Sequence, residues 1–196
     1  MKPASDPGRL IIVSAPSGGG KTTLCRALRQ RMPDLGYSVS FTTRPARPGE
    51  QDGVDYHFID LDDFEKGIAE KRWAEWAVVH GNLYGTSADF LRQALVAGQD
   101  VLLDIDVQGT RQLLAHFPDS LTIFIEPPSM KVLAQRLAGR GTDDPQTVAR
   151  RLRDAEQEMA QRELYRHRII NGRIEATIET LVALVEKERA TGRKEG

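Results

Sequence analysis

The amino-acid sequence predicts an α/β fold with a mostly parallel sheet covered by helices. Wholly apolar runs alternate with segments whose apolar residues recur every three or four positions, the pattern of buried strands followed by amphipathic helices. A glycine-rich segment joins the first of these strands to the first of these helices. The 196 residues, 40% hydrophobic and 28% charged, suffice for one domain with a substantial core.

The segment between the first strand and the first helix has a sequence pattern that predicts phosphate binding. Leu10 to Ser14 is an apolar run rich in β-branched residues, and a helix is expected from Lys21 to about Met32, before Pro33. A strand, a glycine loop, Lys-Thr and a helix form the P-loop arrangement, in which backbone N–H groups and a helix N-terminus face an anion. An ordinary glycine-rich turn is the alternative. The expected phosphate-binding residues are Ser14, Ala15, Pro16, Ser17, Gly18, Gly19, Gly20, Lys21, Thr22 and Thr23.

Two side chains of this segment have predicted chemical roles. Lys21 is placed to reach the β- and γ-phosphates of a nucleotide, and the Thr22 hydroxyl to ligand Mg²⁺. Ala15 stands where the general pattern has its first glycine, and its short side chain still fits there.

A mixed segment follows, with a shaped loop at its start. The loop around Pro45 and Pro48 presents Arg44 and Arg47, and two guanidinium groups suit a terminal phosphate. The neighbouring elements are expected to be strands at Tyr37–Phe41, Val54–Ile59 and Trp73–Val79, a helix from Asp60 or Asp62 to Ile68, and a helix from Ser87 to about Ala97.

The remainder returns to alternating strands and helices. The strand at Asp100–Asp106 ends in two carboxylates, and because side chains alternate along a strand, Asp104 and Asp106 are expected on the same side. Asp104 has the position of a carboxylate that orients Mg²⁺ and its waters. The later elements are expected to be helices at about 109–116, from Met130, from Pro145 and from Ile174, and strands at Leu121–Ile125 and Arg168–Ile170.

Charge and composition exclude several classes of protein. A net charge of −1 indicates neither nucleic-acid nor membrane binding, and no apolar run is long enough to cross a bilayer. The single cysteine excludes an internal disulfide, and the polar first residues do not resemble a signal peptide. A cytoplasmic protein is therefore expected, and a homo-oligomer is left open.

Five blocks, in order, give the chain a family resemblance from about Arg9 to Asn171. It resembles the guanylate kinases in the blocks Thr42-Thr43-Arg44-x-x-Arg47-x-x-Glu50-x-x-Gly53-x-x-Tyr56-x-Phe58-Ile59, Glu75-Trp76-Ala77, Gly81-Asn82-x-Tyr84-Gly85-Thr86, Leu103-Asp104-Ile105-Asp106-x-Gln108-Gly109 and Arg136-Leu137-x-Gly139-Arg140-Gly141.

The resemblance implies a P-loop kinase fold in a single domain, 1–196. Its core would be about 9–36, 98–135 and 152–190, with a small mixed lobe that binds a nucleoside monophosphate at about 37–92 and a lid at about 136–151. The implied reaction transfers the γ-phosphoryl group of Mg·ATP to GMP, and also to dGMP. Two alternatives stay open: a related module that binds phosphopeptides without catalysis, and a P-loop kinase acting on a sugar phosphate.

The resemblance also implies roles for individual residues. The phosphate of GMP would be held by Ser40, Arg44, Arg47, Tyr56 and Tyr84, and guanine would be read by Glu75, Thr86 and Asp106. Carboxylates accept the N1–H and 2-amino donors of guanine, and adenine lacks both of these groups. Asn171 would lie near the base of ATP. The catalytic residues would be Lys21, Arg44, Arg136, Arg140 and Arg151, with Mg²⁺ held by Thr22 and, through water, by Asp104.

Overall fold

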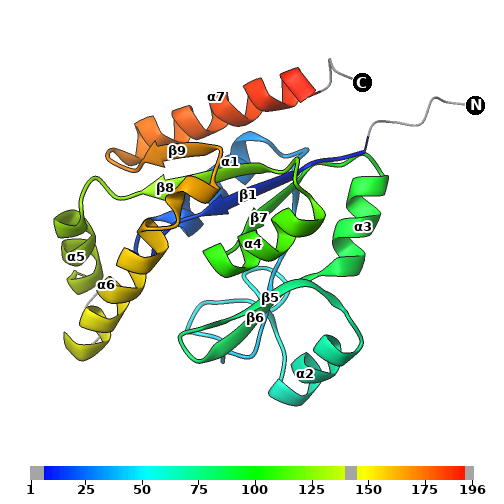
Figure 1. The fold of residues 1–196 in the computed structure, drawn as a ribbon, viewed down its shortest axis with the longest axis horizontal. Helices are drawn as coiled ribbons and strands as arrows, with labels where there is room; N and C mark the ends of the chain where they lie inside the picture. Colours follow the sequence, from blue (N-terminus) through cyan, green and yellow to red (C-terminus); the bar gives the residue numbers. More distant parts are fainter. Residues whose placement is uncertain (1–6, 140–144, 193–196) are drawn as a thin grey trace, which may run out of the picture. The chain divides into compact units, whose positions relative to one another are not determined.

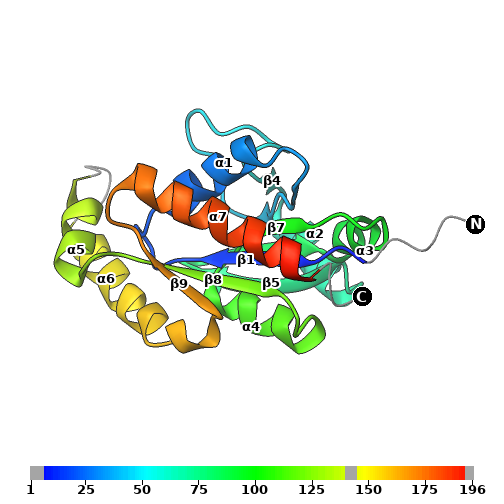
Figure 2. The same ribbon diagram turned by 90° about the horizontal axis from the view of Figure 1, so that it is seen from above.

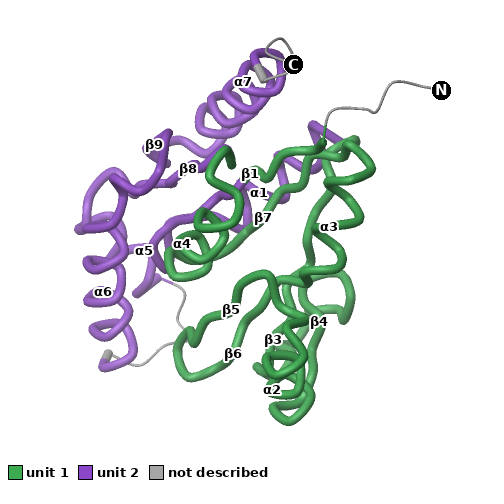
Figure 3. Tube along the Cα trace, turned by 45° about the vertical axis from the view of Figure 1, so that its right-hand side comes forward, with its two compact units in different colours: residues 1–11, 34–120 green, residues 12–33, 121–196 purple. Residues whose placement is uncertain are grey.

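The computed structural model describes residues 7–139 and 145–192. These residues form two compact units, which Figure 3 shows in different colours. Unit 1 contains the described residues up to Ile11 together with Asp34–Ser120, and unit 2 contains Ile12–Pro33 together with the described residues from Leu121 on. The strand β1 (Leu10–Ser14) begins in unit 1 and ends in unit 2.

Unit 1 carries most of the strands. Its elements are β2 (Gly36–Tyr37), β3 (Phe41–Thr42), β4 (His57–Phe58), α2 (Leu61–Ala69), β5 (Trp73–Val79), β6 (Asn82–Ser87), α3 (Ala88–Val96), β7 (Val101–Asp104) and α4 (Val107–His116). Figure 1 labels those from α2 on. The side chains of Asp60, Ser87 and Asp106 cap α2, α3 and α4 by accepting a backbone N–H of the first turn.

Unit 2 is mainly helical. Its elements are α1 (Lys21–Arg31), β8 (Leu121–Glu126), α5 (Met130–Ala138), α6 (Pro145–Met159), a 3₁₀ turn (Arg162–Leu164), β9 (His167–Ile170) and α7 (Ile174–Gly192). The helices α1 and α7 run side by side (Figure 2). The contact between α5 and α6 is a small apolar cluster around Leu133, Leu137 and Ala155, three residues with no exposed surface.

The strands form two sheets with different chemistry. The first has the order β2-β7-β1-β8-β9, and its pairs β2–β7 and β8–β9 are parallel. Its three central strands, β7, β1 and β8, are mainly apolar and almost wholly buried, as a covered parallel sheet requires. The second has the order β4-β3-β6-β5, with β3–β4 parallel and β3–β6 and β5–β6 antiparallel. The α/β class and the mostly parallel first sheet are confirmed.

The second sheet has one core face, which α2 covers. A Cβ on Gly85 of β6 would lie 2.9 Å from the Phe64 ring of α2 and 3.3 Å from Trp73 of β5. The rings of Phe64 and Trp73 stack with centroids 4.7 Å apart, and Trp73 Nε1 donates to the Phe64 carbonyl at 3.1 Å. The opposite face is therefore the one that carries the polar side chains of β5 and β6.

Three predicted elements were wrong in extent. The single strand expected at Tyr37–Phe41 is two short strands in different sheets, because β2 pairs with β7 whereas β3 pairs with β4 and β6. The strand expected at Val54–Ile59 is reduced to His57–Phe58. Asp106 lies beyond the strand that ends at Asp104, where it caps α4, so the alternation argument for the two carboxylates fails.

The remaining elements agree with the sequence to within a few residues, and the strand β6 was missed where only a turn was expected. In the described part of the chain, no helix is both long and apolar enough to cross a membrane.

Candidate active site

In unit 2 the glycine-rich segment turns sharply between β1 and α1. The Gly19 N–H donates to the Pro16 carbonyl at 2.7 Å, and Gly20, the residue that caps α1, has φ of 94°. That left-handed conformation, and the closeness of Asn171 Nδ2 to any Cβ added there, require glycine. Lys21 and Thr22 are the first two residues of α1, so the loop and the helix N-terminus have the P-loop arrangement that the sequence predicts.

The side chain of Asn171 holds this loop through a hydrogen bond to its backbone. Its side chain is 3% exposed, and its Nδ2 donates to the Gly19 carbonyl at 2.8 Å. Its own backbone N–H donates to the Glu126 carbonyl at 2.7 Å, which anchors it at the end of β8. The Oδ1 atom is buried without a hydrogen-bond partner among the described residues. The predicted place near the ATP base stays a prediction, whereas the contact with the loop was not foreseen.

Two of the three predicted lid arginines lie in the described part of unit 2. Arg136 of α5 donates to the Asn171 carbonyl at 2.8 Å. Arg151 of α6 donates to the Ser17 hydroxyl from Nε at 3.0 Å and from an Nη at 2.9 Å. The Arg151 guanidinium group therefore contacts the predicted phosphate-binding segment, and that of Arg136 contacts Asn171, which bonds to the segment. Arg140 lies outside the described residues.

A carboxylate that the sequence did not single out also contacts this loop. The backbone N–H of Ser17 donates to Glu158 Oε2 of α6 at 3.2 Å. Glu158 lies seven residues after Arg151, two turns along the same helix. One face of α6 therefore places a carboxylate and a guanidinium group within hydrogen-bond distance of Ser17.

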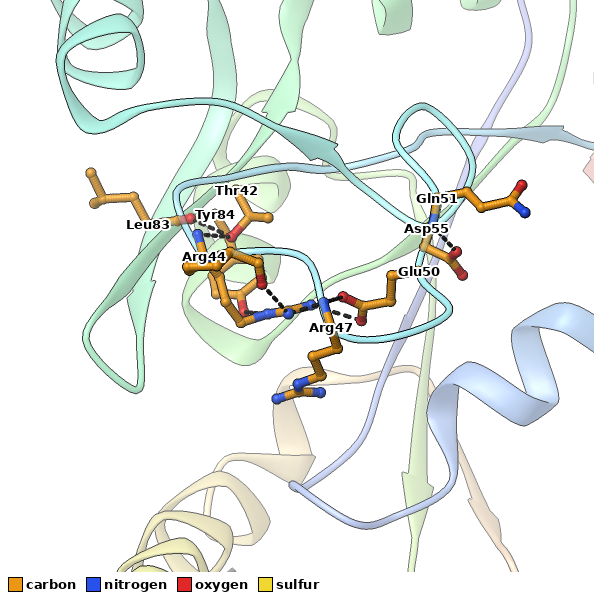
Figure 4. Close-up of polar contacts among 9 residues, drawn as sticks. Thr42, Arg44, Arg47, Glu50, Gln51, Asp55, Leu83 and Tyr84 are labelled. Carbon is orange, nitrogen blue, oxygen red and sulfur yellow. Dashed lines mark hydrogen bonds and ion pairs between the residues drawn. The ribbon is translucent and has the colours of Figure 1, made fainter. Parts of the chain in front are cut away.

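In unit 1 the loop after β3 holds Arg44 in a fixed orientation (Figure 4). Its two Nη atoms donate to the two carboxylate oxygens of Glu50, at 3.0 and 2.9 Å. Its Nε donates to the Tyr84 hydroxyl at 3.2 Å, and one Nη also donates to the Pro45 carbonyl at 2.8 Å. The Arg44 guanidinium carbon lies 5.3 Å from the centroid of the Tyr56 ring.

This pair is largely withdrawn from water. The side chains of Arg44 and Glu50 are 11% and 19% exposed. Hydrogen bonding to Glu50 is the main cause that raises the pKa of Arg44 above its usual value, assisted by Tyr84 and opposed by burial. Burial by itself would raise the pKa of Glu50, but the hydrogen bonds from the Arg44 side chain and the Arg47 backbone outweigh it and lower that pKa.

Arg47 has a different environment from Arg44. Its backbone N–H donates to Glu50 Oε2 at 2.7 Å, but its guanidinium group points away from Glu50 in Figure 4 and is exposed. Ser40 immediately precedes β3, where its carbonyl accepts the His57 N–H at 2.9 Å. Tyr56 and Tyr84 meet edge to face, with ring centroids 5.8 Å apart. The predicted phosphate-binding residues Arg44, Tyr56 and Tyr84 are thus brought together in unit 1.

A second cluster in unit 1 gathers the predicted guanine-reading residues. Glu75 of β5 is 5% exposed, and its Oε1 accepts the Thr86 hydroxyl at 2.5 Å. The two residues are direct cross-strand partners in the β5–β6 register. A Cβ on Gly109 of α4 would lie 2.8 Å from the Glu75 carboxyl carbon, so the carboxylate rests against the first turn of α4. Asp106 accepts the Gly109 N–H at 2.8 Å at that same turn.

A register shift in β5 directs Glu75 toward this cluster. Residues two apart on a regular strand face the same side, yet Trp73 packs on the α2 face while Glu75 pairs with Thr86 on the other. The irregularity between Trp73 and Glu75 accounts for the change of side, as β-bulges commonly do near functional sites.

The two clusters of unit 1 share one strand face. Tyr84 and Thr86 are two residues apart on β6 and therefore point to the same side of the sheet. Two residues of a strand span about 6.5 Å. One end of this face carries the Arg44 guanidinium and tyrosine hydroxyls, and the other carries the carboxylates of Glu75 and Asp106.

Each of the two units contains one of the oxygen donors predicted for Mg²⁺. Thr22 is exposed at the start of α1, and Asp104 is partly exposed at the end of β7. The described residues contain no group of three or more histidine, cysteine, aspartate or glutamate side chains that could hold a metal by themselves. One hydroxyl and one carboxylate fit a hard cation that also binds phosphate oxygens and water.

The comparisons with known proteins agree on one family. Residues 7–188 match the family model of guanylate kinase. Among curated proteins, the guanylate kinase of Syntrophotalea carbinolica is 48% identical over 92% of this chain and 86% of its own length. That of Chromohalobacter salexigens is 50% identical over 93% and 85%. The crystal structure of guanylate kinase from Anaplasma phagocytophilum matches with a TM-score of 0.79 and 32% identity, over 94% of this chain and 87% of the other.

Proposed function

The chain belongs to the guanylate kinase family, and from this premise we propose how its residues divide the transfer of the γ-phosphoryl group of ATP to GMP. Unit 2 would hold ATP and unit 1 would hold GMP. The observation that carries the proposal is the shared face of β6, with a phosphate-binding cluster around Tyr84 and a base-binding cluster around Thr86. A nucleoside monophosphate has this same division into a charged end and a hydrogen-bonding end.

The phosphate of GMP would bind to Arg44, Arg47, Tyr56, Tyr84 and Ser40. Glu50 fixes the orientation of the Arg44 guanidinium group, and the Tyr56 ring and the Tyr84 hydroxyl limit its movement. Arg47, exposed and without a side-chain ion pair in the described part of the chain, would add the second guanidinium group when substrate arrives. A site that is oriented before binding loses less conformational entropy on binding.

Guanine would be read by Glu75 and Asp106, which accept its N1–H and amino protons. The Thr86 hydroxyl donates to Glu75 in this structure, so its predicted bond to guanine O6 requires the hydroxyl to turn once the base donates to Glu75 instead. Adenine has neither an N1–H nor a 2-amino group, so it could not donate these hydrogen bonds to the carboxylates. Sites of this kind reject the wrong substrate by about 10⁴–10⁵.

The triphosphate of ATP would bind to the backbone and side chains of Ser14–Thr23, with Lys21 at the β- and γ-phosphates. Arg136 and Arg151, and Arg140 by its place in the sequence, would stabilise the negative charge on the transferring group. The support from Asn171 holds the loop in the conformation that an anion needs. Its buried Oδ1, which has no hydrogen-bond partner among the described residues, would have to become accessible in order to accept a donor from the adenine base.

Mg²⁺ would be held by the Thr22 hydroxyl and, through water, by Asp104. When bound with ATP it would neutralise charge on the phosphate oxygens. The protein's own residues fix the two phosphate groups, exclude water and supply guanidinium groups, so that catalysis is mainly a matter of position and charge.

The test is a coupled assay of ADP release with GMP, dGMP, AMP, CMP and ribose bisphosphates as acceptors. We expect turnover with GMP and dGMP and little with the others. Turnover with a ribose bisphosphate alone would overturn the proposal in favour of a sugar-phosphate kinase. Binding of a phosphopeptide without any ADP release would instead support the non-catalytic module, which the presence of Lys21, Thr22 and Asp104 argues against.

A further inference from the structure

The strand that carries Glu75 lies at the edge of its sheet. β5 is the last strand in the order β4-β3-β6-β5, so one side of its backbone has no strand partner. The N–H and C=O groups along such an edge must bond to water or to side chains. In unit 1 the helix α4 supplies those side chains.

A single glutamine of α4 takes the place of a neighbouring strand. The Gln112 Nε2 donates to the Trp76 carbonyl at 2.7 Å, and the Gln112 Oε1 accepts the Trp76 N–H at 3.2 Å. The amide group of this side chain thus pairs with both backbone groups of one residue, as a strand residue would. Gln108 reaches the Val78 carbonyl with one weaker bond at 3.4 Å.

The residue clamped in this way is the neighbour of Glu75 in the chain. One turn before Gln112, Gly109 lies against the Glu75 carboxylate and donates its N–H to Asp106. The same helix therefore contacts Glu75 at its carboxylate and, one residue further along β5, at the backbone. Of the two carboxylates assigned to guanine, one lies on β5 and the other on the residue that caps α4, and the Gln112 amide is a direct polar link between that strand and that helix.

We propose that Gln112 is a positioning residue for guanine recognition, which holds β5 against α4 so that Glu75 and Asp106 keep the separation that guanine requires. This inference rests on the proposed function, because it assigns the reading of guanine to those two carboxylates. Gln112 touches no substrate in this scheme and acts through Glu75.

The variant Gln112→Met tests the proposal, since methionine has a similar length and shape but lacks both hydrogen-bonding groups. Trp76 lies at the surface, so water can replace the lost partner and the fold is kept. We expect the KM for GMP to rise about threefold to tenfold, with kcat at saturating GMP and the KM for ATP unchanged. The preference for GMP over IMP, which lacks the amino group, should fall by a similar factor.

The matched control is Gln93→Met on α3, an exposed glutamine of the same unit whose side chain makes no hydrogen bond with the described residues. It should leave every constant unchanged. Calorimetric titration with GMP reports stoichiometry as well as affinity, so that loss of folded protein appears as fewer sites and not as weaker binding.

A double-mutant cycle with Glu75→Gln separates positioning from general stabilisation. If Gln112 acts through Glu75, Gln112→Met should have little further effect on GMP binding in the Glu75→Gln background. Equal effects in both backgrounds, or equal losses for ATP and GMP, would overturn the positioning role. If Glu75→Gln by itself leaves the preference for GMP over IMP intact, the assignment of Glu75 to guanine recognition is wrong. Unchanged GMP binding in Gln112→Met alone would refute the inference and leave that assignment standing.

Discussion

Replacing Gly109 by alanine tests the base cluster most directly. The new methyl carbon would lie 2.8 Å from the Glu75 carboxyl carbon, whereas carbon atoms in contact are about 3.5 Å apart or more. The carboxylate must then move by about 0.7 Å or more. The Thr86–Glu75 hydrogen bond, now 2.5 Å, would lengthen beyond the usual range for two oxygens if that movement were away from Thr86.

The expected result separates binding from stability. A displaced Glu75 carboxylate would lose a hydrogen bond from guanine. Loss of one hydrogen bond to a charged group costs about 1.5–3 kcal/mol, which corresponds to a loss of GMP affinity of about 10- to 100-fold. Alanine favours a helix over glycine by about 1 kcal/mol, and the displaced group is the flexible end of a side chain, so thermal stability should change little. We expect ATP binding to be unaffected.

Calorimetry with GMP and with an ATP analogue, together with thermal unfolding, measures all three quantities. Gly172→Ala is the matched control, because a Cβ there would meet nothing within 4 Å. Normal GMP affinity in Gly109→Ala would show that the carboxylate can leave its place without consequence. The base cluster would then have no role in recognition.

Four further substitutions address the other contacts. Lys21→Ala should lose turnover while GMP still binds by calorimetry, and turnover near the wild-type rate would contradict its role. Arg44→Ala should mainly raise the KM for GMP, by about 100-fold, as expected for a bidentate charged contact, and an unchanged KM would count against it. Glu50→Gln should reduce the free energy of unfolding most above pH 4.5, the usual pKa of a glutamate. Because the pKa of Glu50 is lower in the folded protein, the difference in stability between wild type and variant should narrow as the pH falls through that folded-state pKa. Acid unfolding curves measure this difference, and a difference that does not change with pH would contradict the prediction. Asn171→Ala should raise the KM for ATP and leave that for GMP unchanged in steady-state kinetics, since it removes the bond to Gly19; a change confined to GMP would refute this.

Local patterns were sufficient for most of the fold. The apolar strands, the capping residues Asp60 and Ser87, and the helix that begins at Pro145 are each determined by residues close in sequence, and the structure confirms them. The α/β class follows from their alternation. The P-loop was recognisable because its chemistry lies in one continuous segment.

Features that depend on distant partners were not predictable in the same way. The division of the segment from Gly36 to Thr42 into two strands depends on pairing with β7, some 65 residues later, and with β6. Asp106 could extend a strand or cap a helix, and the helix prevails because its carboxylate accepts the Gly109 N–H. The contact between Asn171 and Gly19 joins residues 152 positions apart, and no local pattern signals it.

Candidate residues were found more readily than their contacts. Arg44, Glu75 and Tyr84 were identified through a family resemblance, but the clamp by Glu50 was not predicted although Glu50 belongs to the same sequence block. An acid six residues after an arginine gives no local signal of a contact, and only the fold shows that the Glu50 side chain is 19% exposed and binds Arg44 through both carboxylate oxygens. Nothing in the sequence indicated that Glu158 would contact the loop at Ser17, because carboxylates on helices are usually solvated.

The exposed edge of β5 has a consequence for the protein at high concentration. Trp76 and Val78 are 37% and 52% exposed on this strand, and an apolar strand edge can template the addition of a strand from another molecule. The amides of Gln112 and Gln108 already occupy backbone groups to which such an intruding strand would bond. By occupying those groups, the two amides leave this edge less able to begin the intermolecular β-sheet association that leads to insoluble aggregates.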